Sequence, residues 1–207
     1  MPLDIDIQRT AVLSMDFSND IVHSEGALKE FGFADMVSEY DVLDKTGQLL
    51  VAARGTGVRV VHVSVKFQPG YPERPANSGL WQSLQDADAL RDGTWGAQIH
   101  PRVAAQASEA VVTKRGVSAF TGTDLDQILR ANGIDTVMLA GVATNLVVEG
   151  TARQACDMGY NTIVVGNCCA AEDKWTHDAA LTITLPSLCT VTSLDEALAA
   201  MGAGVLI

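Results

Sequence analysis

The sequence is poor in aromatic and in basic residues, and both shortages restrict the class of protein. Aromatic residues make up 5% of the chain although 47% is hydrophobic, so we expect a core of Val, Ile, Leu and Ala, as in buried parallel strands. Lys and Arg number 14 against 25 Asp and Glu, which gives a net charge of −11. Because this charge would repel a phosphate backbone, we do not expect a nucleic acid as partner.

Segments typical of membrane or secreted proteins are also missing. No apolar run reaches the roughly 18 residues that a bilayer span requires, and residues 1–4 do not have the character of a signal peptide. The cysteines lack both metal-type and disulfide-type spacing, which is typical of a reducing cytosol. They are Cys156, Cys168, Cys169 and Cys189. We therefore predict a soluble cytoplasmic protein with no membrane partner.

Short apolar runs alternate with segments of helical spacing along the chain. The runs predict six strands, at residues 10–16, 58–65, 110–114, 134–140, 161–166 and 188–192. Helices are predicted at residues 34–56, 124–132, from 144 onward, 174–185 and 194–201. Such alternation is typical of parallel strands covered on both faces. We expect one α/β domain over residues 1–207, a three-layer α/β/α sandwich around a doubly wound six-stranded parallel sheet.

Residues 67–96 form a long segment, rich in Pro, Gly, Asn and Asp, between the second and third predicted strands. A loop of this length in a compact domain is usually functional. We expect substrate specificity to depend on this segment and on residues 20–33. Of its two tryptophans, Trp81 fits loop packing and pocket lining equally well, whereas Trp95 favours the pocket.

Three features fall at the carboxyl ends of predicted strands, where doubly wound sheets bind ligands. Asp16 ends the first strand and Lys114 the third, while Gly141 follows the fourth, just before a helix N-terminus that favours negative charge. Thr144 or Asn145 is predicted to cap this helix. A carboxylate and an ammonium that meet in a dry crevice perturb each other's pKa, as in a general acid or base. Taken singly, they fit a turn carboxylate and a lysine at the sheet rim.

Four segments carry more specific motifs. They read DFSND at 16–20, GTWGAQIHP at 93–101, VVTKRGVSAFTGTDLDQILRANGIDTVMLAGVATN at 111–145 and TARQACDMGYNTIVV at 151–165. In this order they resemble the isochorismatase-like family of α/β hydrolases, within the cysteine hydrolase superfamily. The resemblance implies a catalytic Asp at Asp16 and a catalytic Lys at Lys114, together with a Cys nucleophile. It also implies a cis peptide bond between Val142 and Ala143 and a homodimer or homotetramer.

Valine occupies the position of the implied nucleophile. Counting from the GVATN motif, the Cys position is Val147, and its neighbours Leu146 and Val148 are also inert. Cys156 lies nine residues further, which on an ideal helix places it about 180° away. Hydrolysis through a thioester is therefore disfavoured, because the attacking thiolate is missing.

One interpretation keeps an enzymatic activity. The family's isochorismatase branch also works without this cysteine, and there the Asp at the position of Asp16 is a general acid that protonates the vinyl carbon of an enol ether. Apolar walls would hold such a carboxyl protonated near neutral pH. The candidate walls are Phe17, Trp95 and Val147. Lys114 is then the candidate for binding substrate carboxylates, with Arg91 as a helper.

The alternative interpretation is a member without turnover. In this reading the protein is an amidase (C–N hydrolase) that lost its nucleophile at Val147, naturally or by engineering, and it binds a small ligand or a partner protein. The backbone N–H groups of Leu146 and Val147 would still form an oxyanion site. Asn145 would orient a substrate carbonyl or only cap the helix.

The histidines give no sign of a metal centre. A strand histidine such as His62 is more often a satisfied core residue than a ligand, and no other histidine stands in ligand spacing with it. The four are His23, His62, His100 and His177. We predict neither a metal nor a cofactor.

Overall fold

The molecule is built on one six-stranded parallel sheet in the order β3-β2-β1-β4-β5-β6. This computed structural model describes residues 3–203. The strands are β1 (Thr10–Met15), β2 (Arg59–Val65), β3 (Ala110–Lys114), β4 (Thr136–Val142), β5 (Asn161–Ala170) and β6 (Thr190–Thr192). The winding reverses between β1 and β4, which pair in parallel from Thr10 with Thr136 to Met15 with Gly141. The predicted doubly wound α/β fold is confirmed.

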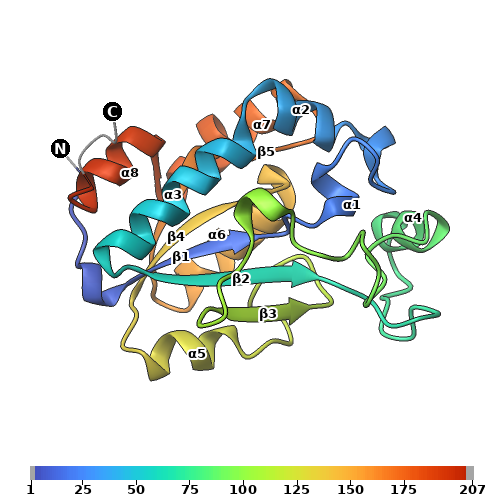
Figure 1. The fold of residues 1–207 in the computed structure, drawn as a ribbon, viewed down its shortest axis with the longest axis horizontal. Coiled ribbons are helices and arrows are strands. Elements are labelled where there is room, and N and C mark those ends of the chain that lie inside the picture. The colour runs from blue at the N-terminus through green and yellow to red at the C-terminus, as the bar shows by residue number, and fades with distance from the viewer. Residues whose placement is uncertain (1–2, 204–207) are drawn as a thin grey trace.

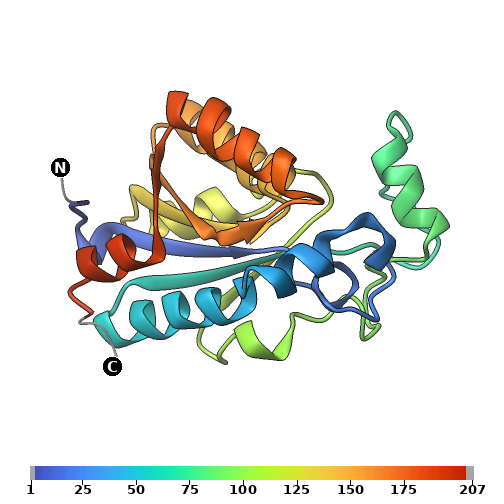
Figure 2. The same cartoon turned by 90° about the horizontal axis from the view of Figure 1, so that it is seen from above.

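Helices cover both faces of the sheet (Figures 1 and 2). One layer consists of α2 (Phe33–Glu39), α3 (Val42–Thr56) and α8 (Leu194–Ala200), and the other of α5 (Leu125–Ala131), α6 (Glu149–Asp157) and α7 (Lys174–Ala179). Two short helices, α1 (Asn19–Val22) and α4 (Gly79–Asp86), lie apart from these layers, beyond the arrowheads of the strands in Figure 1. Short 3-10 turns occupy Ile7–Arg9, Lys29–Phe31, Pro101–Val103 and Leu185–Ser187.

The two layers bury two separate apolar cores, because successive side chains of a strand point to opposite faces. In β1, Leu13 and Met15 belong to the core under α5 and α6, whereas Val12 belongs to the core under α3. All six residues of β1 are buried. A central strand covered on both faces accounts for the continuous apolar run in the sequence.

Several helices and strands depart from the predicted boundaries. The predicted helix at 34–56 is two helices, since the chain breaks at Asp41, which has φ +52°. Residues 67–96 are not entirely loop, because they contain α4. Strand β5 extends to Ala170, so Cys168 and Cys169 lie within it rather than after it. The predicted last turns of the helix at 174–185 are a π-helical turn (Ala180–Thr184) and a 3-10 turn.

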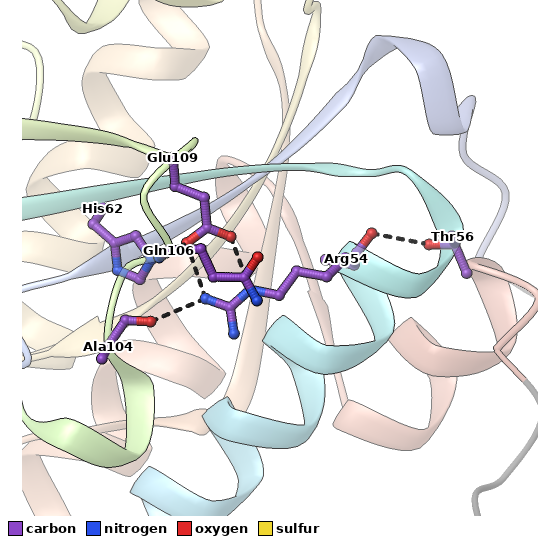
Figure 3. Close-up of polar contacts among 7 residues, drawn as sticks. Arg54, Thr56, His62, Ala104, Gln106 and Glu109 are labelled. Carbon is purple, nitrogen blue, oxygen red and sulfur yellow. Dashed lines mark hydrogen bonds and ion pairs between the residues drawn. The ribbon is translucent and has the colours of Figure 1, made fainter.

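A polar cluster fixes α3 to the segment before β3 (Figure 3). The Glu109 carboxylate accepts hydrogen bonds from Arg54 Nε and Nη2 at 2.8 and 2.9 Å and from the Gln106 backbone N–H at 2.8 Å. It also lies 3.1 Å from Nε2 of the buried His62. Burial would raise the pKa of Glu109, but these donors outweigh it and lower the pKa to about 2. His62 is thus a core residue, as predicted, whose burial lowers its own pKa.

No helix within residues 3–203 is long and apolar enough to cross a membrane.

Candidate active site

Asp16 and Lys114 meet at the carboxyl edge of the sheet, as the sequence predicted. Lys114 Nζ lies 2.8 Å from Asp16 Oδ2, and the two side chains are only 3% and 5% exposed. Asp16 directly follows β1 and has φ +59°. Its Oδ1 accepts the backbone N–H of Val65 at 2.8 Å, and its own N–H donates to Val63 O at 2.8 Å. Strand β2, which lies between β1 and β3, thereby fixes the carboxylate in front of Lys114.

Burial dominates the ionisation of Asp16. Loss of water raises its pKa, against the opposing effects of the Lys114 charge, the Lys114 hydrogen bond and the Val65 N–H. A carboxyl with a raised pKa retains a proton at a pH where an exposed Asp would have lost it. A carboxyl that keeps its proton longer is a candidate for general acid catalysis.

Every N–H group of the Lys114 ammonium has an acceptor. Besides Asp16, it donates to Gly116 O at 2.8 Å and to Val117 O at 3.0 Å. An ammonium carries three donors and no acceptor. Lys114 therefore holds Asp16 and the turn after β3 in place, and it offers no free N–H group to a substrate in this arrangement.

The turn after β4 contains the cis peptide bond between Val142 and Ala143 that the family resemblance implied. The helix behind it begins with a π-helical turn, Thr144–Val148, before α6. Neither predicted cap is present: Thr144 Oγ1 pairs with His177 Nδ1 at 2.7 Å, and Asn145 Nδ2 donates to Glu172 Oε1 at 3.3 Å. The capping prediction was wrong because Thr144 binds His177 of α7, and Asn145 binds Glu172 in the segment between β5 and α7.

The predicted oxyanion site is only partly available. The Leu146 N–H already donates to Ala143 O at 3.2 Å, as does the N–H of Val148. Val147 is buried and lines the cavity beside Asp16. None of the four cysteines lines that cavity. Two of them are buried in β5, where burial raises the pKa of the Cys169 thiol to about 12 and that of Cys168 as well. None of the four thiols is therefore placed to act as a nucleophile in this cavity.

A small apolar cavity of about 70 Å³ opens in front of these groups. Asp16, Lys114, Val142, Ala143, Leu146 and Val147 form its floor together with Val65 and Val117. Its remaining walls come from the two segments expected to govern specificity: Ile21, Leu28 and Phe33 from one, and Leu80, Trp81, Leu84 and Leu90 from the other. A single water occupies roughly 10–15 Å³ on such a measure, so the cavity has room for a small organic group.

The sequence and the fold both match known proteins. Residues 10–196 match the isochorismatase domain. This chain belongs to the isochorismatase family. YecD of Escherichia coli O157:H7, an uncharacterized isochorismatase family protein, is 31% identical over 96% of this chain and 100% of its own. Maleamate amidohydrolase of Pseudomonas putida is 35% identical over 67% of this chain and 64% of its own. An isochorismatase family structure from Burkholderia thailandensis is 29% identical, covers 98% and 100% of the two chains and has a TM-score of 0.77.

In this isochorismatase family member, some predicted site residues do not reach the cavity. Phe17 is buried in the core, Trp95 is 48% exposed and packs edge-on against His23 at 5.0 Å, and Asn145 binds Glu172. None of the three lines the cavity. Arg91 is also absent from its walls and pairs with Asp88. The tryptophan of the cavity is instead Trp81, which α4 carries.

Asp20 is a site residue that sequence reasoning missed. It is buried, and its Oδ2 accepts the N–H of Leu90 at 2.7 Å while its Oδ1 accepts that of Ala27 at 3.0 Å. It thereby joins the two wall segments of the cavity. A Cβ at Gly96 would collide with this carboxylate, which explains the second glycine of GTWG. The signal was the last letter of the DFSND segment.

Among residues 3–203, no group of three or more His, Cys, Asp or Glu side chains is placed to hold a metal ion. The predicted absence of a metal stays a prediction.

Proposed function

We propose that this family member is a hydrolase that works without a cysteine, with Asp16 as general acid on an enol ether. The observation that carries the proposal is a buried carboxyl of raised pKa that faces an apolar cavity lined by Val147, the residue at the Cys position that the family resemblance implies. Chemistry at this site therefore depends on a proton rather than on a thiolate. The hydrolytic function itself fits the family.

The reaction would proceed in three steps. The Asp16 O–H gives its proton to the terminal vinyl carbon, and the electron pair of the C=C bond forms the new C–H bond. The resulting oxocarbenium ion lies beside the Asp16 carboxylate, whose negative charge stabilises it in a dry cavity. Water then adds to the cationic carbon and returns a proton to Asp16. The hemiketal breaks down to a ketone and an alcohol.

Asp16→Asn tests this role, because an amide keeps the shape of the side chain and cannot deliver the proton. We expect turnover of enol ethers to fall at least about a hundredfold, since general acid catalysis contributes 10²–10⁴. Asp44→Asn, at an exposed pair with Arg102, is the matched control and should keep full activity. Near-normal turnover by a folded Asp16→Asn protein would remove Asp16 as the proton donor.

A second candidate follows from the relative that hydrolyses an amide, maleamate amidohydrolase. In that case the chain is an amidase without its nucleophile and acts only as a binding protein. Val147→Cys would then restore slow hydrolysis of small amides, because Asp16 and Lys114 are already in place. Amide hydrolysis by Val147→Cys, together with no enol-ether turnover by the unmodified protein, would favour this candidate over the first.

We also infer a homodimer or homotetramer in the cytoplasm. The support is a family resemblance and two exposed large apolar side chains in the helical segment after β5, Trp175 at 79% and Ile183 at 72% exposure. Association in an oligomer would remove such apolar surface from water. Light scattering on the purified protein tests the assembly: a monomer at micromolar concentration would contradict it.

A further inference from the structure

The charged groups around the cavity indicate which kind of substrate can bind there. This inference rests on the proposed function. Apart from Asp16 and Lys114, all lining residues are hydrophobic. An entering carboxylate would lose its water and would need several new hydrogen-bond donors, since burying a charge without them costs several kcal/mol.

Lys114 does not supply them. Its N–H groups are already shared among Asp16 Oδ2, Gly116 O and Val117 O. An anion that bound Lys114 would have to displace one of these acceptors. Two of them are backbone carbonyls of the turn after β3, so the displacement would also break the turn. The positive charge of Lys114 is thus committed to the protein.

Most of the cations next to the cavity are neutralised as well. Lysine or arginine directly follows four of the lining residues, Leu28, Val65, Leu90 and Lys114. Lys29, after Leu28, is exposed to solvent, and each of the other three cations pairs with a carboxylate. The pairs are Lys66 with Asp92 at 4.0 Å, Arg91 with Asp88 at 3.1 Å and Arg115 with Glu73 at 2.8 Å. The net charge of −11 further lowers the concentration of anions near the protein.

We propose that the substrate of this site is a small, uncharged and largely apolar molecule rather than a carboxylate. Leu80, Trp81 and Leu84 of α4 select it by excluding charge. The proposal separates this chain from any family member that acts on an anion such as maleamate. It also replaces the expectation that Lys114 and Arg91 bind substrate carboxylates.

A matched pair of probes tests the proposal by binding alone. Methyl 2-methoxypropanoate and the 2-methoxypropanoate anion differ only in the ester methyl group, and neither has a C=C bond to react. Binding to the unmodified protein is followed through the methyl NMR signals of Val147 and Ala143, which lie in the cavity. We expect the ester to bind at least about tenfold more tightly, equivalent to ~1.4 kcal/mol. Equal or tighter binding of the anion would overturn the proposal, and so would the absence of binding by both probes.

Leu80→Lys supplies the missing cation from the half-buried end of α4, and Leu80→Met is its neutral control. We expect Leu80→Lys to reduce or reverse the preference for the ester, whereas Leu80→Met keeps it. An unchanged preference in Leu80→Lys would contradict the role of charge exclusion.

Turnover is measured separately, with methyl 2-methoxyacrylate and the 2-methoxyacrylate anion, by formation of the keto product, methyl pyruvate or pyruvate. Ester binding without keto product would refute the proposed reaction and leave the substrate preference standing. Keto product from the anion and not from the ester would refute the substrate preference and leave the proposed reaction standing.

Discussion

The molecule has two carboxylates held by cations at buried sites, and they ionise in opposite ways. Asp16, at the carboxyl edge of the sheet, has Lys114 and one backbone N–H as donors, and burial raises its pKa. Glu109, in the cluster of Figure 3, has two donors from Arg54, one from Gln106 and one from His62, and its pKa falls to about 2.

The difference shows that a cationic neighbour does not by itself determine the ionisation of a carboxyl group. A guanidinium binds both carboxylate oxygens with a rigid pair of N–H groups, while an ammonium acts at a single point. Lys114 also shares its donors with two carbonyls. The carboxyl with many donors therefore fixes structure, and the one with few donors is left available for proton transfer.

The largest effect is expected for Lys114→Met, which removes the only side-chain donor of Asp16. Removing one partner of a buried pair costs about 3–5 kcal/mol of unfolding free energy. A carboxyl such as Asp16, whose pKa is raised in the folded state, favours folding at low pH, and this contribution disappears as pH rises. The decrease in unfolding free energy caused by Lys114→Met should therefore be greater at pH 8 than at pH 5. Denaturant unfolding at both pH values measures it.

Lys174→Met is the control for that prediction, because Lys174 pairs with Asp178 on an exposed helix surface. Its unfolding free energy should change little at either pH. If Lys114→Met changed the unfolding free energy as little as Lys174→Met, the buried pair would contribute no more to stability than the exposed one, which would contradict the prediction.

Glu109→Gln should have the next largest effect, about 1–3 kcal/mol, because Arg54 loses its charged acceptor in a largely buried cluster. Because its pKa is lowered, Glu109 stabilises the folded protein at pH values above the ordinary Glu pKa of 4.5. This stabilisation is lost as pH falls toward about 2. The variant should therefore show a flatter decline of stability between about pH 5 and 2. An unchanged decline would mean that Glu109 is not the group responsible.

The mildest test needs no substitution and compares the two carboxyls directly. Carbonyl ¹³C NMR over the acid range should show Asp16 titrating above the ordinary 3.8 and Glu109 near about 2. Turnover by the proposed mechanism should fall as pH rises through the Asp16 value, because the protonated form is the active one. If Asp16 and Glu109 titrated in the same pH range, the inferred difference between their pKa values would be refuted.

Sequence patterns predicted the strands and the pairing of Asp16 with Lys114 well. Alternating apolar runs mark buried strands whatever their neighbours are, so β1, β2 and β3 fell close to their predicted positions. The motifs placed Asp16 and Lys114 at strand ends and anticipated the cis peptide bond. In contrast, α4 was missed because Pro, Gly and Asn around it obscure a helix of two turns.

Side-chain direction was the least predictable property. Trp95 and Trp81 lie in the same segment, yet only Trp81 faces the cavity, because α4 turns it inward. Thr144 and Asn145 have the chemistry of helix caps, but His177 and Glu172, distant in the sequence, compete for them. Local propensity carries no information about such partners.

By itself, the sequence determined the strand and helix order, the family and the absence of a nucleophile at Val147, because these depend on residue type and spacing along the chain. Only the tertiary structure decided that Lys114 has no free N–H group, that Asp20 joins the cavity walls and that those walls carry no charged side chain besides Asp16 and Lys114. These properties depend on which atoms meet across β1, β2 and β3 and between distant loops, and such contacts are set by packing rather than by any single segment.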